Sequence, residues 1–425
     1  MMAHGQTDSS GQSSMKAGPK TRREFLKNAA AAAAASGLAT ALPLGCGGPK
    51  TAPANPATAP TLSAVNGPRS LRAHAAQHGM LVGCAVVPEK LDGEPDYART
   101  VAEQASILVP ENALKWGPLR PTPDQYDFRK ADDVVAFALS HNQKVRGHNL
   151  CWHEALPSWF AGTVTKDNAA QFLTQHILTV AGRYAGKLHS WDVVNEAVDI
   201  KSGRPDGLRD SPWLELAGPG YIELAFRTAR QADATALLTY NDYAIELDTP
   251  DQIDKRGQVM MLVRRLKARG VPIDAVGVQS HLGAGDAPGA GLIHFVRELR
   301  AMGLQVFITE LDVNDRKLPE SVPDRDTIVA KTYRDYLTMM LAEPNVNVAL
   351  TWGITDRYTW LNGKKNARPD GKPERPLPFD YDYNPTPAFF AERDAIDSRR
   401  RAAQPGSDPY TPFTPGQSGP RGRYE

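Results

Sequence analysis

Two glutamates stand at the ends of apolar runs that read as strands. Glu196 follows Asn195 in the stretch WDVVNEAVD (191–199), and Glu310 lies in VFITELD (306–312). Two carboxylates that face each other across a cleft suit glycoside hydrolysis, in which one protonates the departing sugar oxygen and the other attacks the anomeric carbon. For double displacement they must stand ~5–5.5 Å apart. The pair therefore predicts a catalytic site, if the fold brings the two segments together.

The two glutamates need different protonation states at the working pH. Glu310 lies close in sequence to Asp312, and we expect His281 close to it in space, where an N–H group would keep it ionised and oriented. Glu196 follows a hydrophobic run, so a less solvated setting and repulsion from Glu310 would raise its pKa. We predict that Glu196 is the acid and Glu310 the nucleophile.

Other aromatic and polar residues follow the same kind of apolar run and could bind a sugar. Apolar faces for pyranose rings would come from Trp116, Trp152, Trp352 and Trp360. Groups for hydroxyls would come from Glu111, Asn112, Lys115, His148 and Gln279. Each alone also has an ordinary structural explanation, since a single tryptophan usually belongs to a core, a strand-end histidine often caps a loop and a lysine is often a solvated surface charge. Their joint placement favours the sugar site.

The elements that must position these residues recur along the chain. Apolar runs bounded by turn signals predict strands at 81–87, 106–110, 144–152, 189–195, 236–242, 274–281, 306–312 and 346–353. Helical spacing predicts helices between them, for example at 129–142, 168–186, 219–233 and 249–270. Eight alternating units favour a (β/α)8 barrel over an open doubly wound sheet. A barrel of this kind carries its active site at the carboxyl ends of its strands, where the polar residues above lie.

Seven motifs follow one another in order along the chain and cover nearly all of the central region: ENALKW, GHNLCWHEALPSW, WDVVNEA, YNDY, VGVQSH, ITELD and TWGITDRYTW. Together they resemble glycoside hydrolase family 10, chiefly endo-β-1,4-xylanases. The resemblance implies a retaining mechanism without a cofactor, in which Glu196 is the acid/base and Glu310 the nucleophile. The substrate would be a polysaccharide, xylan, cleaved at internal β-1,4-xylosidic bonds.

The resemblance also implies roles for the surrounding residues. Asn195 would bind the 2-hydroxyl of the sugar being cleaved, and His281 would hold Glu310, with Asp312 behind it. Gln279 and His148 would border the same sugar, and Tyr243 would line the leaving-group side. The sugar and its neighbour on the non-reducing side would be bound by Glu111, Asn112 and Lys115. The sides of the site would be lined by Trp152, Trp352 and Trp360.

Two positions depart from the family's pattern. After the Trp-His of the third strand the family commonly has Ser-Gln, whereas this chain has Glu154 and Ala155. After Asn-Asp-Tyr the family commonly has Asn, whereas this chain has Ala244. Glu154 would add a negative charge near the rim of the cleft, so chain-length preference and tolerance of decorated xylan stay open.

The composition bounds the class of protein. The chain has 425 residues, a formal net charge of +1 and 41% hydrophobic residues, which is typical of a globular protein. No long basic stripe suggests a nucleic-acid partner. Of the cysteines Cys46, Cys84 and Cys151, we expect the last two to be buried free thiols, although a bridge between them stays an alternative. With no repeat or appended binding module, we expect a monomer that works as a single domain.

The two ends of the chain predict processing and flexibility. A twin arginine in TRREFLK (21–27) precedes an Ala-rich stretch, which indicates a twin-arginine export signal over 1–45 and a periplasmic or secreted protein. Cys46 in LPLGC resembles a lipid attachment site, but Pro43 and Leu44 fit that pattern poorly, so anchoring stays open. A Pro/Ala/Thr-rich linker is expected at 46–68, the barrel at 69–399 and a disordered Pro/Gly-rich tail at 400–425. No span through a membrane is expected in the mature protein.

Three other functions stay as alternatives. A metal-dependent barrel hydrolase could use His148, His153, His281 and Asp312, but no His-x-His follows the first strand. A non-catalytic sugar-binding barrel would be expected to have lost one of the two glutamates, and both are present. A retaining β-glycanase of the cellulase or mannanase type is the main alternative within glycosidases.

Overall fold

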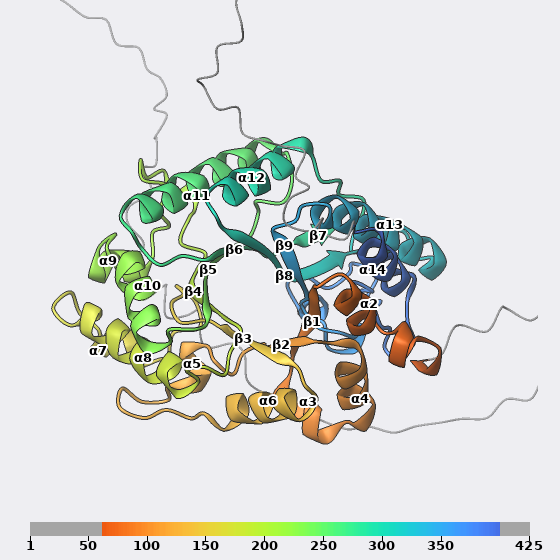
Figure 1. The fold of residues 1–425 in the computed structure, drawn as a ribbon, viewed down its shortest axis with the longest axis horizontal. Helices are drawn as coiled ribbons and strands as arrows, with labels where there is room; N and C mark the ends of the chain where they lie inside the picture. Colours follow the sequence, from red (N-terminus) through yellow and green to blue (C-terminus); the bar gives the residue numbers. More distant parts are fainter. Residues whose placement is uncertain (1–61, 400–425) are drawn as a thin grey trace, which may run out of the picture. The chain divides into compact units, whose positions relative to one another are not determined.

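Eight parallel strands close into a barrel in the computed structural model, which describes residues 62–399 (Figure 1). The barrel order is β1-β2-β3-β4-β5-β6-β8-β9, with β9 pairing back onto β1, and the short β7 pairs with the far end of β8. The strands are β1 (Leu81–Val86), β2 (Ile107–Pro110), β3 (Lys144–His148), β4 (Ser190–Asn195), β5 (Leu237–Asp242), β6 (Ala275–Val278), β7 (His281–Gly283), β8 (Gln305–Asn314) and β9 (Val346–Thr351). The predicted (β/α)8 barrel is confirmed.

Helices surround the strands on the outside of the barrel (Figure 1). The four predicted helices are found, with ends within a few residues of the expected ones. In chain order the α-helices are α2 (Leu71–Gln77), α3 (Pro88–Gly93), α4 (Pro95–Gln104), α5 (Trp116–Leu119), α6 (Arg129–Ser140), α7 (Phe160–Thr163), α8 (Ala169–Arg183), α9 (Pro212–Ala217), α10 (Tyr221–Ala232), α11 (Pro250–Ala268), α12 (Ala290–Ala301), α13 (Val322–Leu341) and α14 (Pro387–Ser398).

Short 3-10 helices mark several connections. They are η1 (Leu62–Val65), η2 (Gly67–Arg69), η3 (Ile200–Ser202), η4 (Asp356–Tyr358) and η5 (Trp360–Asn362). The first lies inside the predicted 46–68 linker and the second crosses its end, and Val65 is buried against the core. The fold therefore begins at least seven residues before the expected boundary at residue 69, because Val65 supplies apolar surface that the barrel covers. The predictions for the rest of the linker, the export signal and the tail lie outside the described residues.

Two apolar clusters fill the two sides of the strands. A large cluster lies between the strands and the helices, and a smaller one lies inside the barrel, formed by Ala85, Ile107, Val109, Ala275, Phe307, Val348, Leu350 and Trp352. Since side chains of a strand alternate between its two faces, the same strands serve both clusters. The buried Arg146 also lies inside, with its guanidinium 5.3 Å from the Phe307 ring, so the barrel is a packed core and not a channel.

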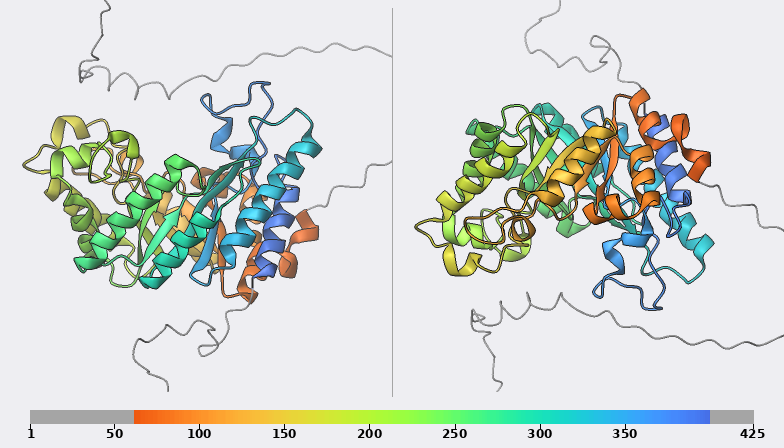
Figure 2. Two further views of the ribbon diagram at one scale, coloured as in Figure 1. Left: turned by 90° about the horizontal axis from the view of Figure 1, so that it is seen from above. Right: turned by 90° about the horizontal axis from the view of Figure 1, so that it is seen from below.

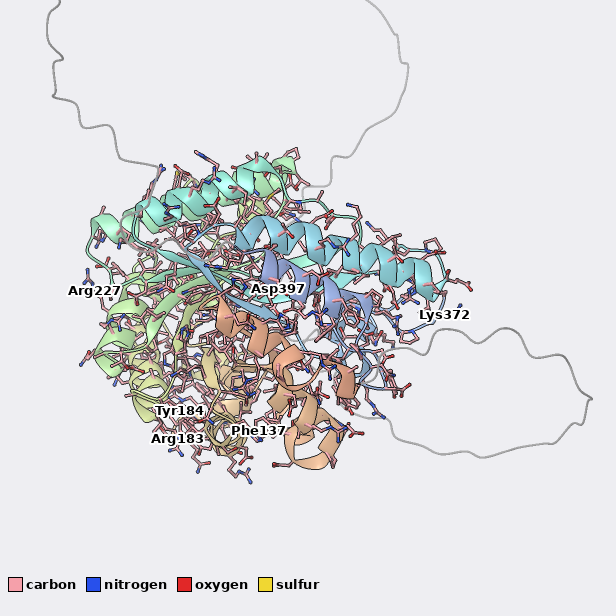
Figure 3. The ribbon with its side chains drawn as sticks, turned by 45° about the vertical axis from the view of Figure 1, so that its right-hand side comes forward. Phe137, Arg183, Tyr184, Arg227, Lys372 and Asp397 are labelled. Carbon is pink, nitrogen blue, oxygen red and sulfur yellow. The ribbon has the colours of Figure 1, made fainter. Side chains whose placement is uncertain are left out.

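Side chains on neighbouring helices tie the outer ring together. His74 of α2 pairs with Asp397 of α14 at 2.7 Å, which joins the first and last helices of the ring (Figure 3). Arg183 and Tyr184, at the end of α8, both bind Asp132 of α6 (Figure 3). Figure 2 shows that α7, α9 and the long segment after β9 lie at the same end of the barrel. This is the end at which the strands finish.

Two strand ends differ from the sequence prediction. β3 ends at His148 and not at Trp152, because beyond it only single backbone bonds, such as that from Leu150 N to Asp192 O, reach β4. The predicted strand 274–281 is divided into β6 and β7, with Gln279 and Ser280 between them.

The cysteines of the described residues lie in the core. Cys84 and Cys151 are both buried free thiols, which confirms the favoured alternative. Within residues 62–399, no helix is long and apolar enough to cross a membrane.

Candidate active site

Glu196 comes directly after β4, at the point where that strand departs from regular pairing. The register of β4 against β5 shifts between Asp192 and Val194, so the alternation of side chains changes and Asn195 comes to lie opposite Asn241. Glu196 itself has φ of 58°, in the left-handed region that residues with a large side chain seldom adopt. The bulge and the turn together direct the Glu196 carboxyl group into the mouth of the barrel.

Three side-chain donors surround the half-buried carboxyl group of Glu196. Oε1 accepts hydrogen bonds from Gln279 Nε2 at 2.9 Å and Asn195 Nδ2 at 3.2 Å. Oε2 accepts one from Trp152 Nε1 at 2.9 Å. Removal from water raises the pKa of Glu196 above its ordinary value, and the hydrogen bonds from Gln279 and Trp152 oppose that rise only in part. The group is therefore suited to carry a proton.

Glu310 lies within β8 and is buried. Burial alone would raise its pKa, but the hydrogen bond with His281, the positive field of His148 and His281, and a hydrogen bond from Asn241 lower the pKa of Glu310 to about 2. His281 Nε2 lies 3.3 Å from Glu310 Oε2, and Asn241 Nδ2 donates to Oε1 at 2.8 Å. The predicted contact with His281 is confirmed, and Glu310 is held as an anion.

Asp312 orients the histidine from behind. Its Oδ1 lies 2.9 Å from His281 Nδ1, and its Oδ2 accepts a hydrogen bond from Trp360 Nε1 at 2.7 Å. Burial would lower the pKa of His281, but Asp312 and Glu310 raise it well above the ordinary value. Asp312 and Glu310 therefore contact opposite ring nitrogens of His281. Trp360 is 43% exposed, which leaves a face of its ring free for a ligand.

Asn241 joins the two halves of the site and was missed in the sequence. It is fully buried in β5, and its Nδ2 donates to Asn195 Oδ1 at 2.8 Å as well as to Glu310. Its own Oδ1 accepts a hydrogen bond from Thr309 at 2.7 Å, which fixes the amide orientation. A signal was present, because Asn241 belongs to the YNDY stretch and lies two residues after Thr239, so that strand alternation places both inside the barrel.

His148 lies at the end of β3 and is oriented by Asp192 on the neighbouring strand β4. Its Nδ1 lies 2.9 Å from Asp192 Oδ2, and Arg146 also pairs with Asp192 inside the barrel. Its ring meets Trp352 edge to face, with centroids 5.3 Å apart. The sequence indicated His148 and Trp352 but not the buried Arg146–Asp192 pair. Nothing in the strand sequences indicates that these two charged residues lie inside the barrel.

Glu111, Asn112 and Lys115 form a hydrogen-bonded row after β2. Asn112 Nδ2 donates to Glu111 Oε1 at 3.1 Å, and Lys115 Nζ donates to Asn112 Oδ1 at 2.9 Å. The Lys115 ammonium lies 5.1 Å from the Trp152 ring and 5.6 Å from the Trp352 ring. Burial lowers the pKa of Lys115 and raises that of Glu111. The row and the two rings lie together, as predicted.

Two cationic side chains contact Tyr243, and one of them also binds the backbone of Glu196. Arg209 Nη2 donates to the Tyr243 hydroxyl at 2.9 Å, and Arg209 Nε donates to the backbone carbonyl of Glu196 at 2.7 Å. The Lys255 ammonium lies over the Tyr243 ring, 3.7 Å from its centroid, and donates to Asp242. Tyr243 is therefore close to the acid/base candidate, as expected. The sequence gave no indication of Arg209 or Lys255.

Trp116 is not part of the site, and its assignment as a sugar-binding ring is wrong. It is buried, its ring stacks on His176 with centroids 3.8 Å apart, and its Nε1 donates to Leu150 O at 2.8 Å. Trp116 begins α5, and its side chain packs in the core with Phe160 and Trp213. The ordinary structural explanation holds for this tryptophan.

The positions that depart from the family pattern lie at turns. Ala155 and Ala244 have φ of 51° and 52°, in the left-handed region. Glu154 is exposed and lies 3.8 Å from His153 Nε2, and its charge contributes to the pKa of Lys115. Glu154 thus adds a negative charge on the same side as Lys115, as expected for a residue at the rim.

The residues of the metal alternative do not gather. His148 and His281 pair with different aspartates, and His153 lies beside Glu154. Within the described part of the chain, no three His, Cys, Asp or Glu residues are grouped so that they could hold a metal ion.

A parallel barrel that carries two carboxyl groups at its mouth, one with a raised pKa and one with a lowered pKa, is typical of hydrolases that act on glycosidic bonds. The model of glycosyl hydrolase family 10 matches residues 70–395 of this chain. The chain belongs to glycosyl hydrolase family 10.

Similar proteins agree with this assignment. The chain is 37% identical over 305 residues to a beta-1,4-xylanase of Dictyoglomus thermophilum, covering 69% of this chain and 83% of that protein. It is 36% identical over 308 residues to endo-1,4-beta-xylanase B of Thermotoga neapolitana, covering 71% and 84%. The crystal structure of native xylanase 10B from Thermotoga maritima superposes with a TM-score of 0.71 at 34% identity, covering 77% of this chain and 98% of that one.

Proposed function

We propose that the protein is a retaining endo-β-1,4-xylanase, which hydrolyses internal xylosidic bonds of xylan through a covalent glycosyl-enzyme intermediate. The observation that carries the proposal is the different surroundings of two carboxyl groups at one barrel mouth, since Glu310 contacts His281 whereas Glu196 accepts hydrogen bonds from Gln279 and Trp152. These surroundings lower the pKa of Glu310 to about 2 and leave that of Glu196 raised by burial, which suits one anion beside one potential acid.

In the first step Glu310 attacks the anomeric carbon while Glu196 protonates the departing glycosidic oxygen. The bond from the anomeric carbon to the leaving sugar breaks, and an ester bond to Glu310 forms. The positive charge of His281 leaves Glu310 ionised until attack. Asn241 keeps the attacking carboxylate in position through its 2.8 Å hydrogen bond to Oε1.

In the second step the same groups act in reverse. Glu196, now an anion, takes a proton from a water molecule, and the oxygen of that water attacks the anomeric carbon. The ester bond to Glu310 breaks, and the sugar is released with its original configuration. The three donors around Glu196 stabilise its charged form between the two steps.

The surrounding residues would bind the chain of sugars on either side of the cleaved bond. Asn195, which is hydrogen-bonded to Glu196 and Asn241, would bind the 2-hydroxyl of the sugar under attack. The row of Glu111, Asn112 and Lys115 supplies hydroxyl partners on the non-reducing side, with Trp152, Trp352 and Trp360 as walls. Gln279 and His148 border the same sugar, and Tyr243 would line the leaving-group side.

Support for xylan as the substrate comes from the relatives, two of which are named as xylanases in different bacteria. The test compares release of reducing ends from xylan, carboxymethyl cellulose and mannan by the purified protein. We expect xylan to be cleaved at least tenfold faster than the other two. A Glu310→Ala preparation serves as the matched control for contaminating activity. Cleavage of cellulose or mannan with none of xylan would overturn the substrate assignment.

We also propose that the protein is exported by a twin-arginine signal and acts as a monomer outside the cytoplasm. The twin arginine in TRREFLK and the Ala-rich stretch after it support export. Mass spectrometry of the N-terminus of protein recovered from the periplasm or medium would test this. A mature protein that retains residues 1–45 would contradict export by this route, and a diacylglyceryl group on Cys46 would show anchoring.

A further inference from the structure

The interruption between β6 and β7 places one residue between the partners of the two catalytic carboxyl groups. Gln279 donates to Glu196, His281 contacts Glu310, and Ser280 lies between them. Gln279 O also accepts the backbone N–H of Glu310 at 2.9 Å. A displacement of Ser280 would therefore move a partner of the acid/base and a partner of the nucleophile at once.

Ser280 has an uncommon conformation that its surroundings must maintain. It is fully buried, and its φ is 69°, in the left-handed region. For a residue with a side chain this conformation is unfavourable, so it persists only where other contacts determine it.

Two buried residues, Glu246 and Tyr336, supply those contacts. Glu246 Oε1 accepts the backbone N–H of Ser280 at 2.9 Å, and its Oε2 accepts the backbone N–H of Ile245 at 2.7 Å. The Ser280 hydroxyl donates to Val278 O at 3.0 Å and lies 2.7 Å from the Tyr336 hydroxyl. Because its one proton goes to Val278, the Ser280 oxygen accepts from Tyr336.

These two residues come from different parts of the barrel. Glu246 lies in the segment after β5, and its own backbone N–H is fixed by Gln252 Oε1 at 2.8 Å. Tyr336 lies in the middle of α13 and is fully buried. Neither has a surface that could meet a substrate. Tyr336 can therefore influence the reaction through Ser280, whereas Glu246 acts through Ser280 and also through its charge, which interacts with His281.

We propose that Glu246 and Tyr336 are positioning residues that hold Ser280, and through it Gln279 and His281, against the two catalytic carboxyl groups. The inference rests on the proposed function, which assigns those carboxyl groups their roles. The backbone at Ser280 would then determine the positions of the partners of both the acid/base and the nucleophile.

The experiment compares Glu246→Gln and Tyr336→Phe with Tyr333→Phe as a matched control. Tyr333 lies one turn earlier on α13, is equally buried and donates its hydroxyl to Pro376 O at 2.8 Å. On an aryl β-xylobioside we expect kcat to fall about tenfold in Glu246→Gln and about threefold in Tyr336→Phe, with KM within about twofold of wild type. The control should keep the wild-type kcat even where its Tm falls.

The pH profile separates positioning from a general loss of stability. Weaker contacts from His281 and Gln279 would raise the pKa values of both Glu310 and Glu196, so both limbs of the kcat/KM profile should move to higher pH. Unchanged limbs, with kcat equal to that of the control, would overturn the proposal.

A measurement without substrate keeps this proposal separate from the proposed function. The pKa of the His281 imidazole, followed by ¹⁵N NMR, should fall in Tyr336→Phe, which removes no charge, as the contact of His281 with Glu310 loosens, and it should stay unchanged in Tyr333→Phe. In Glu246→Gln it should fall further, because the charge of Glu246 also acts on His281. An unaltered His281 pKa in Tyr336→Phe would overturn the positioning role. Failure of the wild type to cleave any β-1,4-glycan would overturn the proposed function, and the NMR result would still decide the inference.

Discussion

Glu196 and Glu310 lie at one barrel mouth, and the pKa of the first is raised while that of the second is lowered to about 2. Gln279 connects them directly, because its side chain donates to Glu196 and its backbone carbonyl accepts the N–H of Glu310. The two carboxyl groups differ in their partners. Among the described residues, the donors to the Glu196 carboxyl group are neutral side chains, whereas the Glu310 carboxyl group contacts a histidine whose own pKa is raised. This difference separates an acid from a nucleophile.

Replacing the histidine tests how Glu310 is kept ionised. In His281→Gln the positive charge is lost, so the pKa of Glu310 should rise toward its ordinary value of 4.5. We expect the acidic limb of the kcat/KM profile to move up by roughly 1–2 pH units. Trp360→Phe, which removes only the second donor to Asp312, should move that limb much less. An acidic limb that stays in place in His281→Gln would contradict this account of Glu310.

Replacing Trp152 tests the state of Glu196. Trp152→Phe removes the N–H that stabilises the Glu196 carboxylate and keeps an aromatic ring. The pKa of Glu196 should rise further, and the basic limb of kcat/KM should move up by roughly 0.5–1 pH unit. Trp159→Phe loses an indole N–H that binds Arg120 O away from the mouth, and it serves as the control. Movement of the limb to lower pH in Trp152→Phe would mean that Trp152 does not stabilise the anion.

The strands and the two glutamates could be predicted because their signals are local. Each strand is an apolar run that ends in a polar residue, and a parallel barrel collects those ends on one face. The sequence around Glu196 and Glu310 therefore predicts both as site residues without reference to how the barrel closes. The contact of His281 with Glu310 and Asp312 was also expected, and the structure confirms it.

The residues that were missed or misplaced depend on contacts that one segment cannot reveal. Asn241 acts through Asn195 and Glu310 on other strands, and Arg146 is buried only because Asp192 neutralises it. Trp116 stacks on His176 of α8, so its distance from the cleft depends on how the helices pack. Long-range packing, not residue type, decides these cases.

Glu392 predicts a dependence of stability on pH. It is buried in α14, and burial raises its pKa from 4.5 to about 8. A group with a raised pKa stabilises the fold fully below the unfolded value near 4.5, and this contribution is lost as the pH rises to about 8. Relative to wild type, Glu392→Gln should gain roughly 1–4 kcal/mol in free energy of unfolding between pH 5 and pH 8.

Urea unfolding at the two pH values measures this gain. The matched control is Glu320→Gln, since the side chain of Glu320 is 70% exposed and its replacement should change the free energy of unfolding little at either pH. A difference between Glu392→Gln and wild type that is equal at both pH values would contradict a protonated Glu392 in the core.

The most direct test of the assigned roles is rescue by azide with an aryl β-xylobioside as substrate. In Glu310→Ala the space left by the carboxylate should admit azide, which attacks the anomeric carbon once and gives a glycosyl azide of inverted configuration. In Glu196→Ala azide should instead replace water in the second step and give a product of retained configuration. We predict the inverted azide from Glu310→Ala alone. The inverted azide from Glu196→Ala, with none from Glu310→Ala, would contradict the account and exchange the two roles.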